Sequence, residues 1–183
     1  DVKAAIPGLA ALAAGIGDQQ VRNRGTIGGS VANNDPAADY PAAVLGLGAT
    51  VKTGSRSIAA DDFFTGMFET ALAEGEIVTS ISFPAAEKAA YAKFPNPASR
   101  YAMVGVFVAK TASGVRVAVT GAGNGGVFRV PAYEAALSAN FSPDAIADGV
   151  VSAADMNSDL HADAEYRAHL VGVIARRAVA AAG

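Results

Sequence analysis

The sequence predicts an α+β fold in which helices pack on one face of an antiparallel sheet. Runs rich in apolar and β-branched residues occupy 91–94, 103–110 and 115–120, and each has the character of a strand. Residues 111–114 fit a hairpin turn between the last two runs. Helical patterns follow the strands instead of alternating with them, and this order is typical of an α+β domain.

The second half of the chain completes this unit. A fourth strand is predicted at 127–130, after a Gly-Asn-Gly-Gly segment at 123–126 that we interpret as a loop or hairpin and not as a nucleotide site. Helices are predicted at about 131–138, 142–153 and 162–181. On the last helix, Tyr166, Arg167 and His169 are interpreted as surface or interface residues.

The first half of the chain predicts a different mixture of elements. Leu9 and Leu12 share one face of a helix over 8–16, which Gly17 ends. A change of pattern at residues 84–88 then divides the chain into domains 1–84 and 85–183. Between these points we expect a long polar loop at 18–35, a helix at 36–47, a strand at 49–53, a turn at 54–57, a short helix at 61–66 and an alternating strand at 77–83.

Composition excludes several classes of function. The net charge of −3 offers no electrostatic case for binding nucleic acid or an anionic membrane. The absence of cysteine excludes disulfides, thiolate catalysis and cysteine-ligated iron–sulfur clusters on this chain. His161 and His169 lie eight residues apart, so we expect no metal site, and no catalytic residue is assigned.

No signal peptide or membrane span is apparent in the sequence, and a cytoplasmic location is expected. The chain begins at Asp1, inside a helical pattern, so we expect it to be the product of an N-terminal truncation.

A glycine pair is the most informative local feature. Thr26-Ile27-Gly28-Gly29-Ser30 follows two arginines, and paired glycines allow a ligand to approach the backbone closely. Main-chain N–H groups in such a turn can bind an anion. Asp35-Pro36 then resembles a helix N-cap followed by proline. On the glycines alone, a phosphate site and a ligand-free tight turn are equally good interpretations.

The longer pattern resembles the flavin-binding medium subunits of the molybdenum hydroxylases, which include aerobic carbon monoxide dehydrogenase and relatives in the xanthine dehydrogenase family. The resemblance follows the family's order along essentially the whole chain. It rests on the segments 16–30, 35–41, 62–66, 72–78, 98–106 and 161–170. It implies that residues 1–84 are the C-terminal part of an FAD-binding domain of the PCMH type, and that 85–183 are the C-terminal domain of the medium subunits.

The resemblance also implies a set of cofactor-binding residues. The FAD pyrophosphate would lie against the main chain of the glycine segment, and Asp39 would accept hydrogen bonds from sugar or ribityl hydroxyls. Arg22 and Arg24 could offset phosphate charge or brace the loop through salt bridges, and bracing is the preferred interpretation. The implied residues are Thr26, Ile27, Gly28, Gly29 and Ser30 at the pyrophosphate, Asp39 at the hydroxyls, and Ile77, Val78, Lys93 and Tyr101 near the flavin ring.

Two positions depart from the family pattern. Many relatives have asparagine where this chain has Ser30, and many have aspartate where it has Arg100. These departures leave open a flavin-free structural or interaction module of the same fold. A flavin oxidase of the covalently flavinylated type is a further alternative, although the C-terminal motifs match the medium subunits better.

The implied function is electron transfer from partner [2Fe-2S] clusters, through FAD, to an external acceptor. In the family the molybdenum cofactor belongs to a large subunit and the clusters belong to a small one, and the complex can be membrane-associated. A carbon monoxide dehydrogenase-like enzyme is expected. Because the family supplies a further pyrophosphate loop upstream, we expect this chain alone to be inactive and to bind FAD weakly or not at all.

Overall fold

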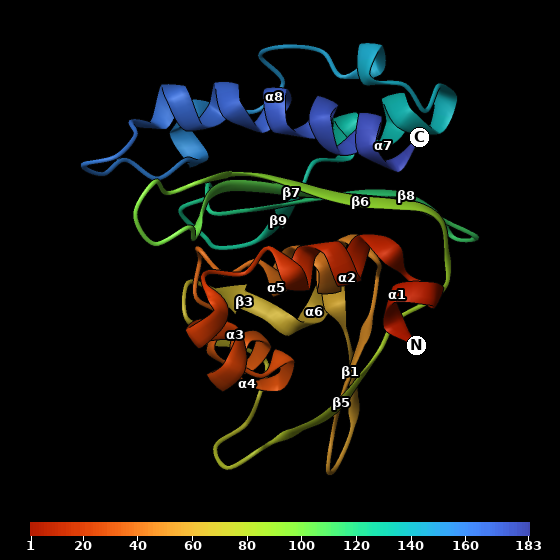
Figure 1. Ribbon diagram of the computed structural model, residues 1–183, viewed down its shortest axis with the longest axis vertical. Helices are drawn as coiled ribbons and strands as arrows, with labels where there is room; N and C mark the ends of the chain where they lie inside the picture. Colours follow the sequence, from red (N-terminus) through yellow and green to blue (C-terminus); the bar gives the residue numbers. More distant parts are fainter.

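The computed structural model describes every residue from 1 to 183, and a four-stranded antiparallel sheet lies at its centre. Helices cover both faces of this sheet (Figure 1). Its strands have the order β6-β7-β8-β9, with bounds β6 Ala86–Pro95, β7 Ala102–Thr111, β8 Gly114–Thr120 and β9 Phe128–Arg129. The predicted α+β class, the strands and the hairpin at 111–114 are confirmed.

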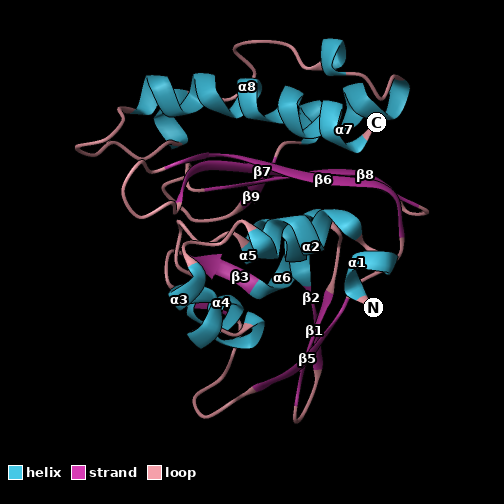
Figure 2. Cartoon of the chain, viewed as in Figure 1, coloured by secondary structure: helices cyan, strands magenta, loops and turns pink.

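Helices α7 (Pro131–Ala139) and α8 (Ala164–Ala182) cover the face of the sheet that was expected to carry helices (Figure 2). The largest core cluster lies between them and the sheet, where Val104 and Val106 of β7 meet Ile174 of α8. All three side chains are fully buried. Burial of such apolar side chains, at about 1.5–3 kcal/mol each, fastens the helices to the sheet.

The predicted helix at 142–153 is wrong. The structure has two single 3-10 turns there, η1 (Pro143–Ala145) and η2 (Ala153–Asp155), with irregular chain between them. Gly149 has φ +71°, which a helix does not allow. The Ile146 carbonyl accepts a hydrogen bond from the Arg176 side chain instead of from a helical N–H.

The opposite face of the sheet is covered by helices from the first half of the chain. They are α1 (Val2–Ala5), α2 (Pro7–Ala14) and α5 (Tyr40–Gly46), and α2 and α5 contact the sheet directly. Gly46 is needed for this contact, because a Cβ there would lie 2.9 Å from the Phe107 ring. The resulting core cluster of eight buried residues includes Leu9, Leu12, Leu47 and Phe107.

Two small sheets complete the first half. One has the order β2-β1-β5, and its strands are β1 (Thr50–Thr53), β2 (Ser57–Ala59) and β5 (Val78–Ser82). The other pairs β3 (Phe64–Gly66) with β4 (Glu69–Thr70). The strands expected at 49–53 and 77–83 are confirmed, but only the first part of 61–66 is helical, as α6 (Ala60–Phe63).

The predicted loop at 18–35 is wrong, because it contains helices α3 (Gln19–Arg24) and α4 (Ile27–Asn33). Asp18 and Thr26 cap them by accepting hydrogen bonds from the N–H groups of Val21 and Gly29. The helix expected at 36–47 begins only at Tyr40. The Asp35 side chain accepts from Ala37 N–H and so forms a turn instead of a helix cap.

Arg167 is buried, so its predicted surface position is wrong. Only 2% of the residue is exposed, and its guanidinium donates to the carbonyls of Met103 and Gly121 and to the Asp159 carboxylate. Tyr166 and His169 are not buried, as expected. Arg167 therefore fastens the start of α8 to the end of the central sheet.

The structure contains no helix with both the length and the apolar character needed to cross a membrane.

Candidate cofactor site

A cleft of about 850 Å³ opens between the end of α2, helix α3, the first turn of α4, the turn before α5 and the loop joining β6 to β7. Four of the residues proposed from the sequence line it: Thr26, Ser30, Asp39 and Tyr101. The remaining lining residues are Ala13, Ala14, Ile16, Gly17, Val21, Arg22, Gly25, Asp35, Ala37, Ala38, Tyr40 and Ser99. The cleft therefore joins segments that are far apart in the sequence.

The first turn of α4 presents hydrogen-bond donors with no protein acceptor. The Thr26 hydroxyl oxygen accepts from Gly29 N–H at 3.0 Å, and the Thr26 carbonyl accepts from Ser30 N–H. The N–H groups of Ile27 and Gly28 have no acceptor in the protein. Unpaired N–H groups and the helix dipole both favour an anion at this end. The Thr26 hydroxyl can still donate its own proton.

The structure explains why glycine stands at one of the two glycine positions of α4 but not at the other. A Cβ on Gly29 would lie 3.0 Å from the Thr26 hydroxyl oxygen, so the helix cap itself requires a small residue there. A Cβ on Gly28 would meet no atom outside the helix closer than 3.9 Å, at the Val78 carbonyl. Gly28 is also helical, with no positive φ. Nothing within the protein explains a glycine at this position, although glycine weakens a helix.

Strand β5 lies beside α4. Two of the four residues proposed to lie near the flavin ring, Ile77 and Val78, stand at its start and differ in burial. Val78 packs at the edge of the cluster that contains Val31, Val51 and Phe63, close to Gly28. Ile77 is 73% exposed and makes no part of the cleft wall. An apolar side chain with this exposure gains nothing from the fold of this chain.

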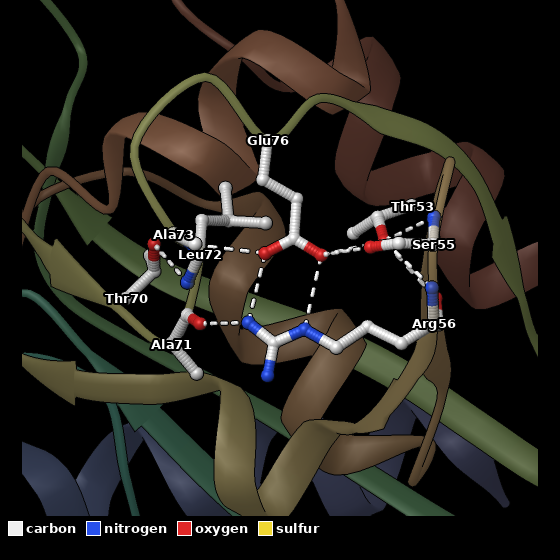
Figure 3. A network of polar contacts seen from close by, with 8 residues as sticks. All are labelled: Thr53, Ser55, Arg56, Thr70, Ala71, Leu72, Ala73 and Glu76. Carbon is white, nitrogen blue, oxygen red and sulfur yellow. Dashed lines mark hydrogen bonds and ion pairs between the residues drawn. The ribbon is translucent and has the colours of Figure 1, made fainter.

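The segment that presents Ile77 is held by a polar network around Glu76 (Figure 3). The Glu76 carboxylate accepts hydrogen bonds from Thr53, Ser55, Arg56 and the Ala73 N–H, at distances of 2.7–3.1 Å. Its side chain is only 8% exposed. Hydrogen bonding by Arg56, above all, holds the pKa of Glu76 well below its usual range. The network ties the loop before β5 to the hairpin between β1 and β2.

The carboxylate of Asp39 is held by two side chains of β6. The Tyr91 hydroxyl donates to Asp39 Oδ1 at 2.5 Å, and the Lys93 ammonium donates to Oδ2 at 3.2 Å. Asp39 is 5% exposed. Burial raises the pKa of Asp39, and the contacts with Tyr91 and Lys93 oppose that rise. Burial and the neighbouring carboxylate raise the pKa of Tyr91 well above 10, so its hydroxyl remains a donor.

Lys93 therefore lies against Asp39 and not in the cleft wall. Its side chain is 12% exposed. The sequence resemblance implies that this ammonium is a cation beside the flavin ring, whereas in the structure its charge is opposed by a carboxylate 3.0 Å away.

Tyr101 reaches the cleft from a tightly closed loop. The Asn96 side chain accepts from the N–H groups of Ala98 and Ser99 and donates to the Tyr101 hydroxyl. Arg100 has φ +64°, a left-handed conformation that is uncommon for a residue with a side chain. This loop fixes an aromatic ring at the cleft by backbone geometry and not by core packing.

Arg22 braces the cleft, as proposed from the sequence. Its guanidinium donates to the carbonyls of Ile16 and Gly17 and to the Gln19 side chain. It also lines the cleft, whereas Arg24 is exposed and lies outside the lining. The main residue that sequence reasoning missed is Tyr91. Its position two residues before Lys93 on a strand was the available signal, since such residues share a face.

Comparison with known proteins identifies the family. A family model described as the FAD binding domain in molybdopterin dehydrogenase matches residues 1–86. The nicotine 6-hydroxylase medium subunit of Paenarthrobacter nicotinovorans is 36% identical, over 97% of this chain and 68% of the relative. The carbon monoxide dehydrogenase medium chain of Hydrogenophaga pseudoflava is 33% identical, over 99% and 68%.

Solved structures agree with these relatives. Reconstituted CO dehydrogenase from Oligotropha carboxidovorans matches with a TM-score of 0.89 and 30% identity, over 99% of this chain and 68% of that one. Carbon monoxide dehydrogenase from Hydrogenophaga pseudoflava, in a form lacking the Mo-pyranopterin moiety, matches with a TM-score of 0.87 and 35% identity. The match extends beyond the FAD-binding domain to the central sheet and α8.

The site fits the cofactor that this family binds. FAD combines an anionic diphosphate, hydroxyl-bearing sugar and ribityl groups, and an aromatic ring. The first turn of α4, which borders the cleft through Thr26 and Ser30, has free N–H groups on Ile27 and Gly28 and open space at the Gly28 Cβ position, although Ile27, Gly28 and Gly29 do not themselves line the cleft. The cleft wall adds the Asp39 carboxylate and the Tyr101 ring. Together with the comparisons, this places the chain in the family of FAD-binding medium subunits of the molybdenum hydroxylases.

Proposed function

We propose that this chain forms most of an electron-transfer subunit that holds FAD and accepts electrons from iron–sulfur clusters on a partner protein. The observation that carries the proposal is the first turn of α4. It combines two unpaired N–H groups with a glycine that neither packing nor backbone conformation requires. A diphosphate supplies the charge and the oxygen acceptors that such a turn favours.

Each residue has a proposed role. The N–H groups of Ile27 and Gly28 and the hydroxyls of Thr26 and Ser30 donate to the diphosphate. Gly29 keeps the helix cap intact. The remaining residues act on the rest of the cofactor. Asp39 accepts hydrogen bonds from its hydroxyls, and Lys93 acts through Asp39. Tyr101 lies beside the flavin ring, and Val78 and Ile77 give apolar contact.

When bound, FAD supplies a centre that exchanges electrons one or two at a time. The partners supply the remaining chemistry. We propose a large subunit with the molybdenum cofactor and a small subunit with two [2Fe-2S] clusters, because this chain has no cysteine to ligate a cluster. Relatives are named for carbon monoxide, nicotine and glyceraldehyde. The substrate is therefore a property of the large subunit, with a carbon monoxide dehydrogenase-like enzyme as our proposal.

The division of the chain is also a proposal. The family match over residues 1–86 supports an FAD-binding part at 1–84 and a C-terminal domain at 85–183. The 183-residue chain spans 68% of the length of the nicotine 6-hydroxylase and Hydrogenophaga pseudoflava carbon monoxide dehydrogenase medium chains, so we assign the activity to the intact protein and its complex. We expect the chain alone to have no dehydrogenase activity and to hold FAD weakly. Stoichiometric FAD on this chain alone would contradict that expectation.

Titration of FAD against the intact subunit that contains this chain tests the proposal. FAD and riboflavin are compared, because only FAD carries the diphosphate. We expect tight binding of FAD, much weaker binding of riboflavin, and a loss of this preference in Gly28→Ala. Equal binding of FAD and riboflavin would contradict the proposal that the diphosphate lies at the first turn of α4. A colourless subunit that still assembles with its partners would favour the flavin-free structural module.

A further inference from the structure

Tyr91 and Lys93 form no part of the cleft wall, yet both hold the carboxylate of Asp39, which lines the cleft. The two residues lie on the same face of β6, two positions apart. Asp39 immediately precedes α5, far from them in sequence. The contact is therefore made by tertiary packing between the sheet and the helical layer.

The Asp39 carboxylate keeps capacity for another donor. Its two protein hydrogen bonds come from the Tyr91 hydroxyl on Oδ1 and the Lys93 ammonium on Oδ2. An ionised carboxylate has about four acceptor positions, so acceptor positions remain free on a residue that lines the cleft. A carboxylate with this much burial is costly unless it is paired, and Lys93 provides the pairing charge.

Gly105 of β7 leaves the space that the Tyr91 hydroxyl occupies. A Cβ on Gly105 would lie 2.1 Å from that hydroxyl oxygen, so any other residue would displace it from Asp39. Gly105 is paired with Lys93 across the two strands and lies in the middle of a buried strand. Glycine weakens a strand interior unless a close approach requires it.

We propose that Tyr91 and Lys93 are positioning residues, which hold the Asp39 carboxylate so that it accepts a hydrogen bond from an uncharged hydroxyl of the bound cofactor. This inference rests on the proposed function. The carboxylate repels phosphate, whereas the first turn of α4 attracts it. The two features therefore orient a ligand that carries both a diphosphate and hydroxyl groups.

A double-mutant cycle on the intact subunit tests the inference. FAD is titrated against the unaltered protein, Tyr91→Phe, Asp39→Asn and the double variant. Each single substitution is expected to weaken FAD binding by about tenfold, the effect of one hydrogen bond to a charged group. The double variant is expected to bind no more weakly than Asp39→Asn, because Tyr91 acts through Asp39.

Two controls separate positioning from general damage. Tyr133→Phe removes a hydroxyl from a buried tyrosine outside the cleft, where it donates to the Ala147 carbonyl, and is expected to leave FAD affinity unchanged. Lys93→Met repeats the test without altering Tyr91, with Lys88→Met as its control on the same strand. We expect Lys93→Met to weaken binding as Tyr91→Phe does.

The outcomes are distinct. Additive losses in the cycle, or an equal loss in Tyr133→Phe, would overturn the positioning role. Tight FAD binding that Asp39→Asn leaves unchanged would overturn this inference while the proposed function stands. Failure of the unaltered subunit to bind FAD would overturn the proposed function and this inference with it.

Discussion

Replacing Gly28 by alanine should make the apoprotein more stable and its FAD binding weaker. The stabilising part follows from geometry. Gly28 is helical, and a Cβ there would meet its nearest atom outside the helix at 3.9 Å, an ordinary contact. Substitution of a compatible helical glycine by alanine stabilises a protein by about 0.4–1 kcal/mol. For a domain of this size that corresponds to roughly 1–4 °C in Tm.

The loss of FAD binding follows from the direction in which a Cβ at position 28 would point. A Cβ in a helix points toward the helix N-terminus, where the N–H groups of Ile27 and Gly28 have no protein acceptor. A methyl group there would hold a diphosphate away from both donors. Hydrogen bonds to a charged group contribute about 1.5–3 kcal/mol each, so the loss of even one weakens FAD binding by about tenfold or more.

Thermal unfolding of the apoprotein and titration with FAD measure the two effects separately. Gly29→Ala is the matched control, because a Cβ there would lie 3.0 Å from the capping Thr26 hydroxyl and should destabilise the fold. A Gly28→Ala protein that is both more stable and fully competent to bind FAD would refute the assignment of the diphosphate to α4. A less stable apoprotein would refute the conclusion that a Cβ at position 28 fits without a clash.

Three other predictions concern the fold. Arg167→Met should lower the free energy of unfolding, measured in urea, by about 3 kcal/mol, because it removes a buried charged group from two carbonyls and a carboxylate. The control is Arg176→Met, which removes a partly exposed guanidinium and should lower it by about 1 kcal/mol or less. Glu76→Gln should lower Tm at neutral pH. Since the folded-state pKa of Glu76 is depressed, its contribution is fully present above about pH 4.3 and shrinks progressively as the pH falls from there toward the folded-state pKa. A Tm difference that does not narrow between about pH 4 and about pH 2 would contradict the network. Gly46→Ala should destabilise the protein by about 1–3 kcal/mol through its clash with Phe107, and an unchanged urea midpoint would show that α5 can move off the sheet.

The central sheet could be predicted because its signals are local. Long apolar runs at β7 and β8 are joined by a short turn, and the same strands are buried on both faces in the structure. The α3–α4 segment could not be predicted as helical from its glycines, which favour turns. Its helices depend on the caps at Asp18 and Thr26, which satisfy donors that a six- or seven-residue helix cannot satisfy alone.

The burial of polar residues was harder to predict from the sequence. Arg167 has the same spacing as the buried Leu170, Val171 and Ile174, so its helical face could have been inferred, but its carbonyl partners on β7 and beyond β8 are visible only in the fold. Asp39 was identified from the family resemblance. Its contact with Tyr91 joins residues 52 positions apart and depends on how α5 packs on the sheet.

The flavin content of the intact subunit, purified in complex with its partners, tests the central claim most directly. The account predicts one FAD per copy of this chain, released on denaturation and largely lost in the Gly28→Ala protein. A flavin-free subunit in an assembled, active complex would contradict it, because the first turn of α4 and the cleft beside it would then have no ligand to bind.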